Sequence, residues 1–233
     1  MTPGDERATR REFVGGVSRL ASVAILPASI AAAGMAPSKA SPQAATNAEW
    51  DLSWLQLLTG ATDRAVFDWP TMGDPADPMV FQLAARYLDN CEAVYAPGTY
   101  QARVVLNIRT QAVPVALNDQ LWERYALGIE YKVNDPNTQQ PAVRNPFWHR
   151  APSTIPGYTV PTLEDFLKRG AFILVCDFAL GHLAQRLAPK SGRPVEAVHS
   201  DLRSGFVPSA YAVPSGIYGL ARAQNAGCAY MKF

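Results

Sequence analysis

The sequence predicts a three-layer α/β domain with a mostly parallel sheet, and three observations support that prediction. Short apolar runs rich in branched side chains alternate with longer segments in which apolar residues recur at helical spacing. The clearest run, 171–175, is too short for a helix and has no polar alternation, which is typical of a strand buried on both faces. Finally, a chain of 233 residues that is 48% hydrophobic can bury a full core.

The mature fold is expected to begin near Trp50. Residues 51–58 place three leucines at helical spacing and are followed by Gly60, which predicts a short opening helix. The first strand is predicted at 64–69, where a mostly apolar run ends at Pro70.

A β-α-β unit follows from the next two segments. Asp77 and Pro78 begin a predicted helix, with proline in its first turn, that ends near Asn90. Residues 103–109 are polar only at their ends and predict the second strand, and such a crossover is almost always right-handed. The expected buried positions of the helix are Val80, Phe81, Leu83, Ala84, Tyr87 and Leu88.

The region after the second strand is predicted to hold a helix over 112–126 and then a long insertion. Asn118 and Asp119 are the expected entry to the helix, whose inward residues are Leu121, Trp122, Tyr125 and Ala126. Residues 127–160 are rich in turn formers. Insertions of this length in compact domains are usually functional covers or disordered segments, and the aromatic residues here favour an ordered cover.

Five chemically distinct residues gather in the insertion: Arg144, Asn145, Phe147, Trp148 and His149. A cover over a ligand needs apolar area to exclude water and a few polar groups to orient the ligand. Arg144, Asn145 and Trp148 are therefore candidate ligand-binding residues, and His149 is a candidate proton-transfer group. An equally weighted alternative is that the two aromatic rings only pin a surface loop to the core.

The central strand joins two helices. Residues 162–170 predict a helix with N-cap Thr162, an acidic first turn and a terminal glycine, and this helix leads into the 171–175 strand. Beyond the strand, Asp177 is the expected N-cap of a longer helix. The predicted buried positions of that helix are Phe178, Leu180, Leu183, Ala184 and Leu187.

Cys176 is the leading catalytic candidate because it lies at this strand-to-helix junction. Ligands of open parallel sheets collect outside the carboxyl ends of the strands, where helix N-termini present positive partial charge. That charge favours a thiolate at Cys176, whereas the adjacent Asp177, a further candidate ligand-binding residue, disfavours one. Arg109 also ends a parallel strand and is a candidate anion-binding residue. In the alternative interpretation, Cys176 is a small buried apolar side chain.

The C-terminal part completes the sheet. Residues 201–207 fit a short helix or a loop, and 210–213 predict a strand. Ser215 then precedes a helix, and N-capping explains it better than nucleophilic catalysis, although it remains a candidate ligand-binding residue. Residues 228–233 predict a last strand. The positions that support the last helix are Ile217, Leu220, Ala221 and Gln224.

Charge and the reactive residue types exclude several functions. Lys plus Arg (21) balances Asp plus Glu (20), so the chain has no basic field for nucleic acid. No histidine pair has zinc-site spacing, with His182 on a helix and His199 in a polar loop, and neither a phosphate loop nor a Gly-x-Ser-x-Gly elbow occurs. We predict no cofactor or metal. A disulfide between Cys91 and Cys228 is possible but has no support in the spacing.

The N-terminus resembles a twin-arginine export signal. Arg10 and Arg11 are followed, one residue later, by an apolar pair, and a modestly apolar run over 20–33 is too short and weak for a membrane span. We therefore expect an export signal over 1–36 and a linker over 37–49. The protein is then periplasmic or otherwise exported, or membrane-tethered if the leader is retained.

From the order of these elements, and from the segments 170–176, 213–224 and 227–232, the single domain over 50–233 resembles the DsrE-like superfamily, with a flavodoxin-like α/β fold. More narrowly, it is similar to exported members with a twin-arginine leader, a branch of largely unassigned function. Characterised DsrE-like proteins relay sulfane sulfur as a cysteine persulfide, and Cys176 occupies the matching position. The resemblance also implies an oligomer.

Two functional hypotheses follow. In the first, Cys176 is a thiol nucleophile or sulfur carrier that can hold a persulfide, Arg109 and Arg144 bind a small anionic or sulfur-containing ligand, and His149 or His182 transfers a proton. In the second, the protein is catalytically silent. It would then bind a small ligand or serve as an accessory subunit of an exported or membrane-bound partner.

Overall fold

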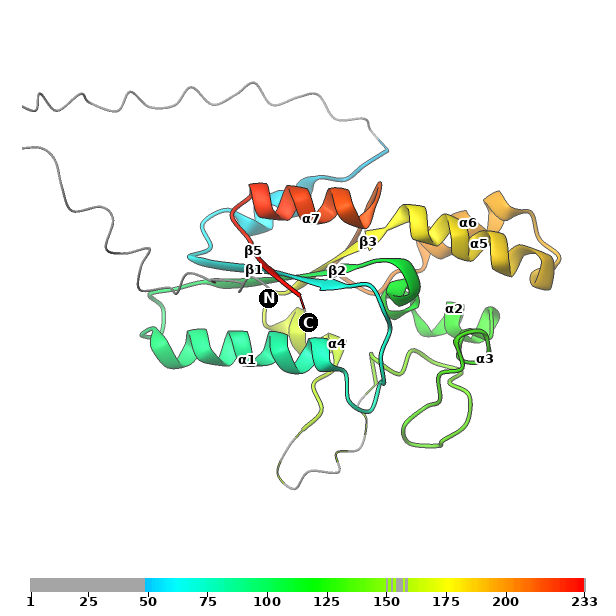
Figure 1. The fold of residues 1–233 in the computed structure, drawn as a ribbon, viewed down its shortest axis with the longest axis horizontal. Helices are drawn as coiled ribbons and strands as arrows, with labels where there is room; N and C mark the ends of the chain where they lie inside the picture. The colour runs from blue at the N-terminus through cyan, green and yellow to red at the C-terminus, as the bar shows by residue number, and fades with distance from the viewer. Residues whose placement is uncertain (1–48, 150, 152, 154–156, 158, 233) are drawn as a thin grey trace, which may run out of the picture. The chain divides into compact units, whose positions relative to one another are not determined.

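The computed structural model describes residues 49–149, 151, 153, 157 and 159–232, which belong to one compact unit. Its centre is a five-stranded sheet of order β4-β3-β2-β1-β5 in which every neighbouring pair is parallel (Figure 1). The predicted α/β fold with a parallel sheet is therefore confirmed. The strands are β1 (Asp63–Trp69), β2 (Ala102–Ile108), β3 (Phe172–Cys176), β4 (Ala210–Val213) and β5 (Ala229–Met231).

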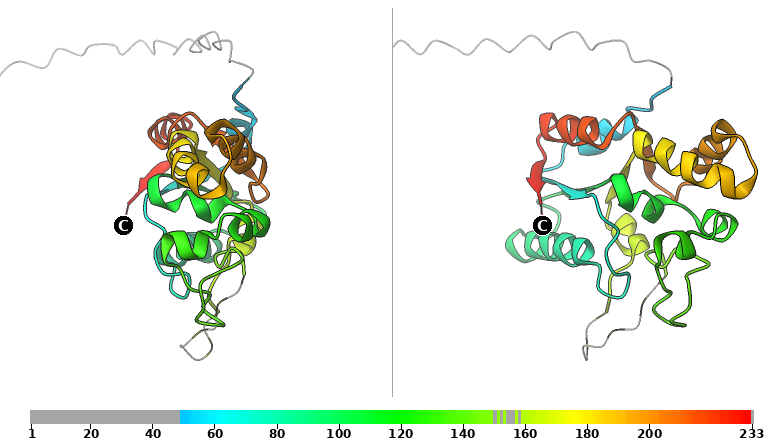
Figure 2. Two further views of the ribbon diagram at one scale, coloured as in Figure 1. Left: turned by 90° about the vertical axis from the view of Figure 1, so that its right-hand side faces the viewer. Right: turned by 45° about the vertical axis from the view of Figure 1, so that its right-hand side comes forward.

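Helices cover both faces of the sheet. Figure 1 shows α7 and η2 on one face, α1 and α4 on the other, and α2, α3, α5 and α6 beyond the carboxyl ends of β2 and β3. Figure 2 shows that these last four helices, here called the helical extension, gather at one end of the sheet. The helices are η2 (Ser53–Leu58), α1 (Met79–Val94), η3 (Thr110–Ala116), α2 (Asp119–Arg124), α3 (Leu127–Tyr131), α4 (Leu163–Lys168), α5 (Asp177–Ser191), α6 (Val195–Ser204) and α7 (Gly216–Asn225).

The strand order creates a switch point between β1 and β5. The chain adds β2, β3 and β4 successively to one side of β1 and then returns through α7 to place β5 on its other side. In a flavodoxin-like sheet the edge strand beside β1 is the second strand of the chain, whereas here it is the last. Crevices at the carboxyl ends of strands next to such a switch point are the usual ligand sites of open α/β sheets.

Alternate residues of each strand enter two separate cores. On β2, Leu106 and Ile108 join the large core under α1, α4 and the helical extension, whereas Val105 joins a smaller core under η2 and α7. All five residues of β3 are buried, as predicted for a strand covered on both faces. The sheet is therefore the middle layer of three.

The first helix after β1 differs from the prediction at both ends. Pro78 is the N-cap and lies outside α1, and α1 continues to Val94, past the predicted end near Asn90. Cys91, beyond the predicted end, is one more buried residue of this helix. Leu83, predicted to be buried, is 37% exposed.

The predicted helix over 112–126 is two separate elements, η3 and α2. A 3-10 helix, η3, contains Pro114, and Asn118 then caps α2 by accepting a hydrogen bond from the backbone N–H of Leu121, as predicted. Ala126 adopts a left-handed conformation (φ 47°) that separates α2 from α3, and it is exposed, not buried. The opening helix over 51–58 is likewise a 3-10 helix, η2.

Four of the five predicted buried positions of α5 are confirmed, whereas the predicted face of α7 is out of phase with the observed one. Cys176, not Asp177, is the N-cap of α5, and Phe178 is 67% exposed. Ile217 on α7 is 75% exposed, while Gly216, Gly219 and Ala223 form the buried stripe. The difference arises because α7 packs with its smallest residues, which a search for large apolar residues passes over.

The prediction also missed most of the length of α6. A short helix or a loop was expected over 201–207, whereas α6 covers 195–204. Consequently His199 is helical and does not lie in a loop. Pro194 is the N-cap of α6 and lacks a side-chain capping group, so the usual start signal is absent. In contrast, α4 has the predicted N-cap: Thr162 and Asp165 form a capping box.

The insertion over 127–160 contains regular structure where it is described. Helix α3 opens it, and an antiparallel bridge pairs Asn134 with Pro141. Phe147 is 2% exposed and packs edge-on against Trp69 and Phe81, at centroid distances of 5.8 and 6.4 Å. Phe147 therefore pins the insertion to the core, as one of the two interpretations of the loop aromatic residues predicted.

The predicted export signal and all of the predicted linker except its last residue, Glu49, lie outside the described residues. Within the described part of the chain, no helix has the length and apolar character needed to cross a membrane.

Candidate functional site

The carboxyl edge of the sheet holds an ion pair between β1 and the residue after β2. Arg109 donates from Nε to Asp68 Oδ1 at 2.7 Å and from Nη2 to Asp68 Oδ2 at 2.8 Å. Asp68 is 2% exposed, and the Arg109 side chain retains 28% exposure. This bidentate geometry fixes the guanidinium plane at the carboxyl edge of the sheet.

Two further side chains complete the cluster. Asn107 is fully buried and donates from Nδ2 to Asp68 Oδ1 at 3.4 Å, and Tyr230 on β5 donates its hydroxyl to Asp68 Oδ2 at 3.1 Å. Because the Asp68 carboxylate can only accept, it also fixes which end of the Asn107 amide faces it. Asp68, Asn107, Arg109 and Tyr230 are called the edge cluster below.

Helix α7 lies directly over the edge cluster. A Cβ on Gly219 would lie 2.8 Å from Asn107 Oδ1, and one on Gly216 would lie 2.7 Å from Arg109 Cβ. Asn107 Oδ1 has no hydrogen-bond partner in the described part of the chain. Glycine at these two positions therefore lets the helix approach the polar side chains closely.

The electrostatics of the edge cluster centre on Asp68. Burial raises the pKa of Asp68, but the hydrogen bonds and positive charge of Arg109 outweigh burial and bring the pKa below its usual value. The Asp68 hydrogen bond also raises the pKa of Arg109. Burial and then the Asp68 hydrogen bond raise the pKa of Tyr230. Asp68 is thus held ionised beside a permanent cation.

Cys176 ends the adjacent strand at the same level. Ile108 pairs with Val175 in the β2–β3 register, so the next residues, Arg109 and Cys176, follow on neighbouring strands. Cys176 is 5% exposed and is the N-cap of the 15-residue helix α5. The structure therefore brings together the predicted Cys176 and Arg109.

Asp177 does not face this pair as an unpaired charge. Its Oδ1 lies 3.1 Å from His199 Nε2 and 3.4 Å from Arg203 Nε, both on α6. The Arg203 guanidinium partly balances the carboxylate that was expected to oppose an anion at Cys176. Asp177 is thereby a link between α5 and α6.

Ser215 lies at the beginning of α7 and has a capping role. Its side-chain oxygen accepts from the backbone N–H of Tyr218 at 3.2 Å. The backbone N–H of Phe178 donates to the carbonyl of Pro214, which joins the starts of α5 and α7. Ser215 therefore stands near the edge cluster in the fold, with its hydroxyl engaged by the helix.

The other predicted site residues form a second group, away from these contacts. His149 Nε2 lies 2.8 Å from Asp119 Oδ2, and the backbone N–H of Asn145 donates to Asp119 Oδ1 at 2.9 Å. Asn145 is fully buried, and its Nδ2 donates to the carbonyls of Val115 and Leu117. Its amide thus holds the insertion in place. Among the described residues, no hydrogen bond or ion pair joins this group to the edge cluster.

A pocket of about 300 Å³ lies beside this second group. Trp148 lines it and is half-buried, whereas Arg144 is exposed and does not line it. The lining residues are Asn118, Asp119, Gln120, Asn145, Trp148, Phe206, Val207 and Pro208. The chain therefore offers two separate candidate sites, the edge cluster with Cys176 and this pocket, called the Trp148 pocket below.

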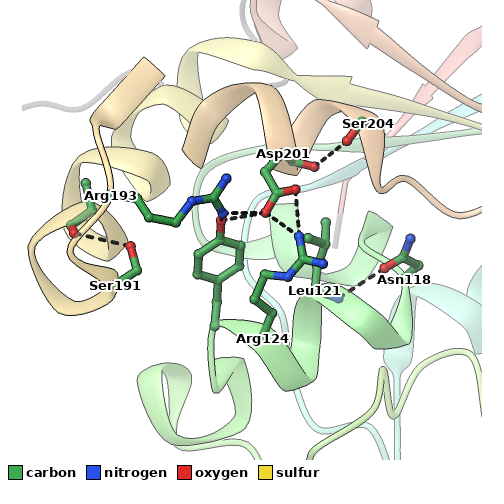
Figure 3. A network of polar contacts seen from close by, with 9 residues as sticks. Asn118, Leu121, Arg124, Ser191, Arg193, Asp201 and Ser204 are labelled. Carbon is green, nitrogen blue, oxygen red and sulfur yellow. Dashed lines mark hydrogen bonds and ion pairs between the residues drawn. The ribbon is translucent and has the colours of Figure 1, made fainter. Parts of the chain in front are cut away.

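A third polar group ties the helical extension together. Asp201 on α6 accepts hydrogen bonds from Arg124 at 2.7 Å, from Arg193 at 2.9 Å and from the Tyr125 hydroxyl at 2.6 Å (Figure 3). Burial tends to raise the pKa of Asp201, but these bonds lower it to about 2. Because its groups bind one another, this network is best explained as a structural link between α2 and α6.

The remaining candidates lack partners suited to chemistry. His182 is exposed on α5 and contacts the ring of Phe178 at a centroid distance of 4.6 Å. All three cysteines are free, so Cys91 and Cys228 form no disulfide. Among the described residues, no three His, Cys, Asp or Glu side chains gather as metal ligands.

Comparison with known proteins assigns this chain to no family. No protein-family model and no curated protein matches the sequence. Among solved structures, the chain is similar to a protein of unknown function from Methanobacterium thermoautotrophicum, with 13% identity and a TM-score of 0.34. That match covers 73% of this chain and 99% of the other.

Sequence reasoning identified Arg109 and missed its partners Asp68, Asn107 and Tyr230. A signal for Asp68 was present, since it lies between Phe67 and Trp69 at the end of an apolar strand. A carboxylate there requires a cation or several donors. Tyr230 carried no such signal, because its role depends on β5 returning to the side of β1.

Proposed function

We propose that this protein is an exported DsrE-like protein that carries sulfane sulfur on Cys176. The observation that supports the proposal is the position of Cys176 at the end of β3, directly before α5 and level with Arg109. A helix N-terminus and a guanidinium are the surroundings that favour a sulfur anion. The edge cluster would hold Arg109 in position through Asp68.

The transfer step needs no metal or external oxidant. The Cys176 thiolate attacks the outer sulfur of a donor persulfide, a new S–S bond forms at Cys176, and the donor's S–S bond breaks. The electron pair of the broken bond leaves with the donor as a thiolate. The sulfane sulfur keeps its oxidation state and now forms a persulfide on Cys176. Arg109 would hold the anionic donor and product.

Alkylation of the three thiols tests this proposal. At pH 8 a mild alkylating reagent should modify Cys176 faster than Cys91 or Cys228, because burial raises the pKa of Cys91 and raises that of Cys228 to about 11. Arg109→Leu should slow the reaction at Cys176, whereas Arg86→Leu, at an exposed arginine of α1, should not. A Cys176 that is inert in the native protein would contradict the proposal.

The second candidate is a non-catalytic role in ligand binding or as an accessory subunit. It is favoured by the 5% exposure of Cys176 and by the separate Trp148 pocket. In this case the protein purified from its own source should retain a small molecule or an exported partner in native mass spectrometry. A ligand-free monomer would count against this candidate.

A further inference from the structure

The Trp148 pocket combines one apolar wall with short polar side chains. Trp148, Phe206, Val207 and Pro208 provide the apolar surface, and Asn118, Asp119 and Gln120 provide the polar groups that line it. Among the residues that the structure describes, no lysine or arginine lines the pocket. The described lining therefore lacks the cations that an anionic ligand requires.

The Asp119 carboxylate is held in place and is already partly satisfied. Oδ1 accepts from the backbone N–H of Asn145, and Oδ2 contacts His149 Nε2 at 2.8 Å. Each carboxylate oxygen can accept one more hydrogen bond, so Asp119 offers two directed acceptor positions. A carboxylate bonded in this way suits hydroxyl donors better than an ammonium group, which binds best to an unpaired carboxylate.

The two amides add further polar groups, and the amide of Asn118 has a fixed orientation. Asn118 Oδ1 caps α2 by accepting from the backbone N–H of Leu121, so Nδ2 is the end left for a ligand. The Gln120 side chain is exposed and makes no hydrogen bond in the described part of the chain, so its amide is free to donate or to accept. A ligand must then present groups that both donate and accept, as adjacent hydroxyls on one ring do.

From these features we propose that the Trp148 pocket binds a neutral pyranose sugar or its glycoside. The apolar C–H face of the ring would lie against Trp148, and its hydroxyls would donate to Asp119 and accept from Asn118 and Gln120. The pocket volume of about 300 Å³ admits one such ring. This inference gives the second candidate function a ligand class, and it does not depend on sulfur chemistry at Cys176.

The test uses the full chain and a panel of methyl pyranosides with glucose, galactose, mannose and N-acetylglucosamine configurations. Ligand-observed saturation-transfer NMR should show saturable binding of at least one of them. Trp148→Ala and Gln120→Ala should each weaken that binding by about tenfold. Trp50→Ala and Gln224→Ala are matched controls outside the pocket lining and should leave affinity within about twofold.

Gln120→Ala changes an exposed side chain, so it tests the pocket even if Trp148→Ala disturbs the fold. Two outcomes would overturn the proposal: no pyranoside of the panel saturates the wild-type chain, or Gln120→Ala and a folded Trp148→Ala bind like wild type. Inorganic phosphate or benzylamine displacing the sugar from the pocket at equal concentration would also overturn the ligand class. Cys176→Ala should keep the sugar affinity, which separates this result from the fate of the sulfur-carrier proposal.

Discussion

Arg109 and Asp68 face each other across the carboxyl ends of β1 and β2, joined by hydrogen bonds of 2.7 and 2.8 Å. Asp68 is nearly inaccessible, whereas Arg109 keeps part of its side chain in solvent. The pair thus anchors a positive charge at the edge of the sheet, one strand away from Cys176.

Removing the carboxylate should be costly. Asp68→Asn would leave the half-buried Arg109 guanidinium without its counter-charge, so we expect a loss of about 2 to 3 kcal/mol in the free energy of unfolding. Urea denaturation monitored by circular dichroism measures the loss. Glu123→Gln, at an exposed residue of α2, is the control and should change stability by less than about 0.5 kcal/mol. Equal effects of the two substitutions would contradict the role given to the ion pair.

Acid should weaken the fold through the two paired aspartates. The pKa of Asp68 is lowered and that of Asp201 is about 2, so both stabilise the folded state above their unfolded pKa of about 3.9. That stability is lost as the pH falls through the folded values. For Asp201 we expect a loss of about 1 kcal/mol between about pH 4 and pH 2, because solvent screens its ion pairs.

In Asp201→Asn, this part of the pH dependence should disappear while stability at pH 7 falls by a similar amount. Urea midpoints measured between pH 2 and pH 7 provide the comparison. An unchanged acid slope in Asp201→Asn would show that Asp201 does not link α2 to α6 as described.

Alanine substitutions of two glycines on different helices should change the stability of the protein in opposite directions. A Cβ at Gly219 meets Asn107 Oδ1 at 2.8 Å and Val213 Cγ2 at 3.2 Å, so Gly219→Ala should destabilise by about 1 to 3 kcal/mol. A Cβ at Gly181 meets nothing within 4 Å, so Gly181→Ala should stabilise α5 by up to about 1 kcal/mol. Thermal unfolding of both variants gives the signs. If Gly219→Ala were neutral, α7 would not lie as close to the edge cluster as described.

Ser215 should behave as a helix cap. Ser215→Ala should cost about 1 kcal/mol of stability because the Tyr218 N–H loses its side-chain acceptor, and Ser215→Asn should restore most of that loss. Sulfur loading of Cys176 should be the same in both variants. A loss of loading that Asn does not restore would give the hydroxyl a direct part in the chemistry.

Local patterns predicted the parts of this fold that depend on short stretches of sequence. The buried strand β3 and the Thr162 capping box follow from neighbouring residues alone. The buried face of α7 does not follow from neighbouring residues. Gly216 and Gly219 are buried because their small size leaves space for Arg109 and Asn107, which lie at the end of β2. Such pairings exist only once the sheet is assembled.

The candidate site was predictable to a similar extent. Cys176 and Arg109 could be found because each ends a predicted parallel strand, and parallel strands share their carboxyl edge. His149 was grouped with them although the structure pairs it with Asp119, at the beginning of α2. Its position depends on the path of the insertion, for which periodicity carries no information.

Intact-mass spectrometry of the protein purified natively from its own source, before and after a reductant, tests the sulfur-carrier proposal most directly. The proposal predicts a loss of about one sulfur atom's mass on reduction, mapped by peptide analysis to Cys176 and absent from Cys176→Ser. An unmodified Cys176 that also stays unmodified after incubation with a persulfide donor would contradict it. The role of the protein would then rest on ligand binding.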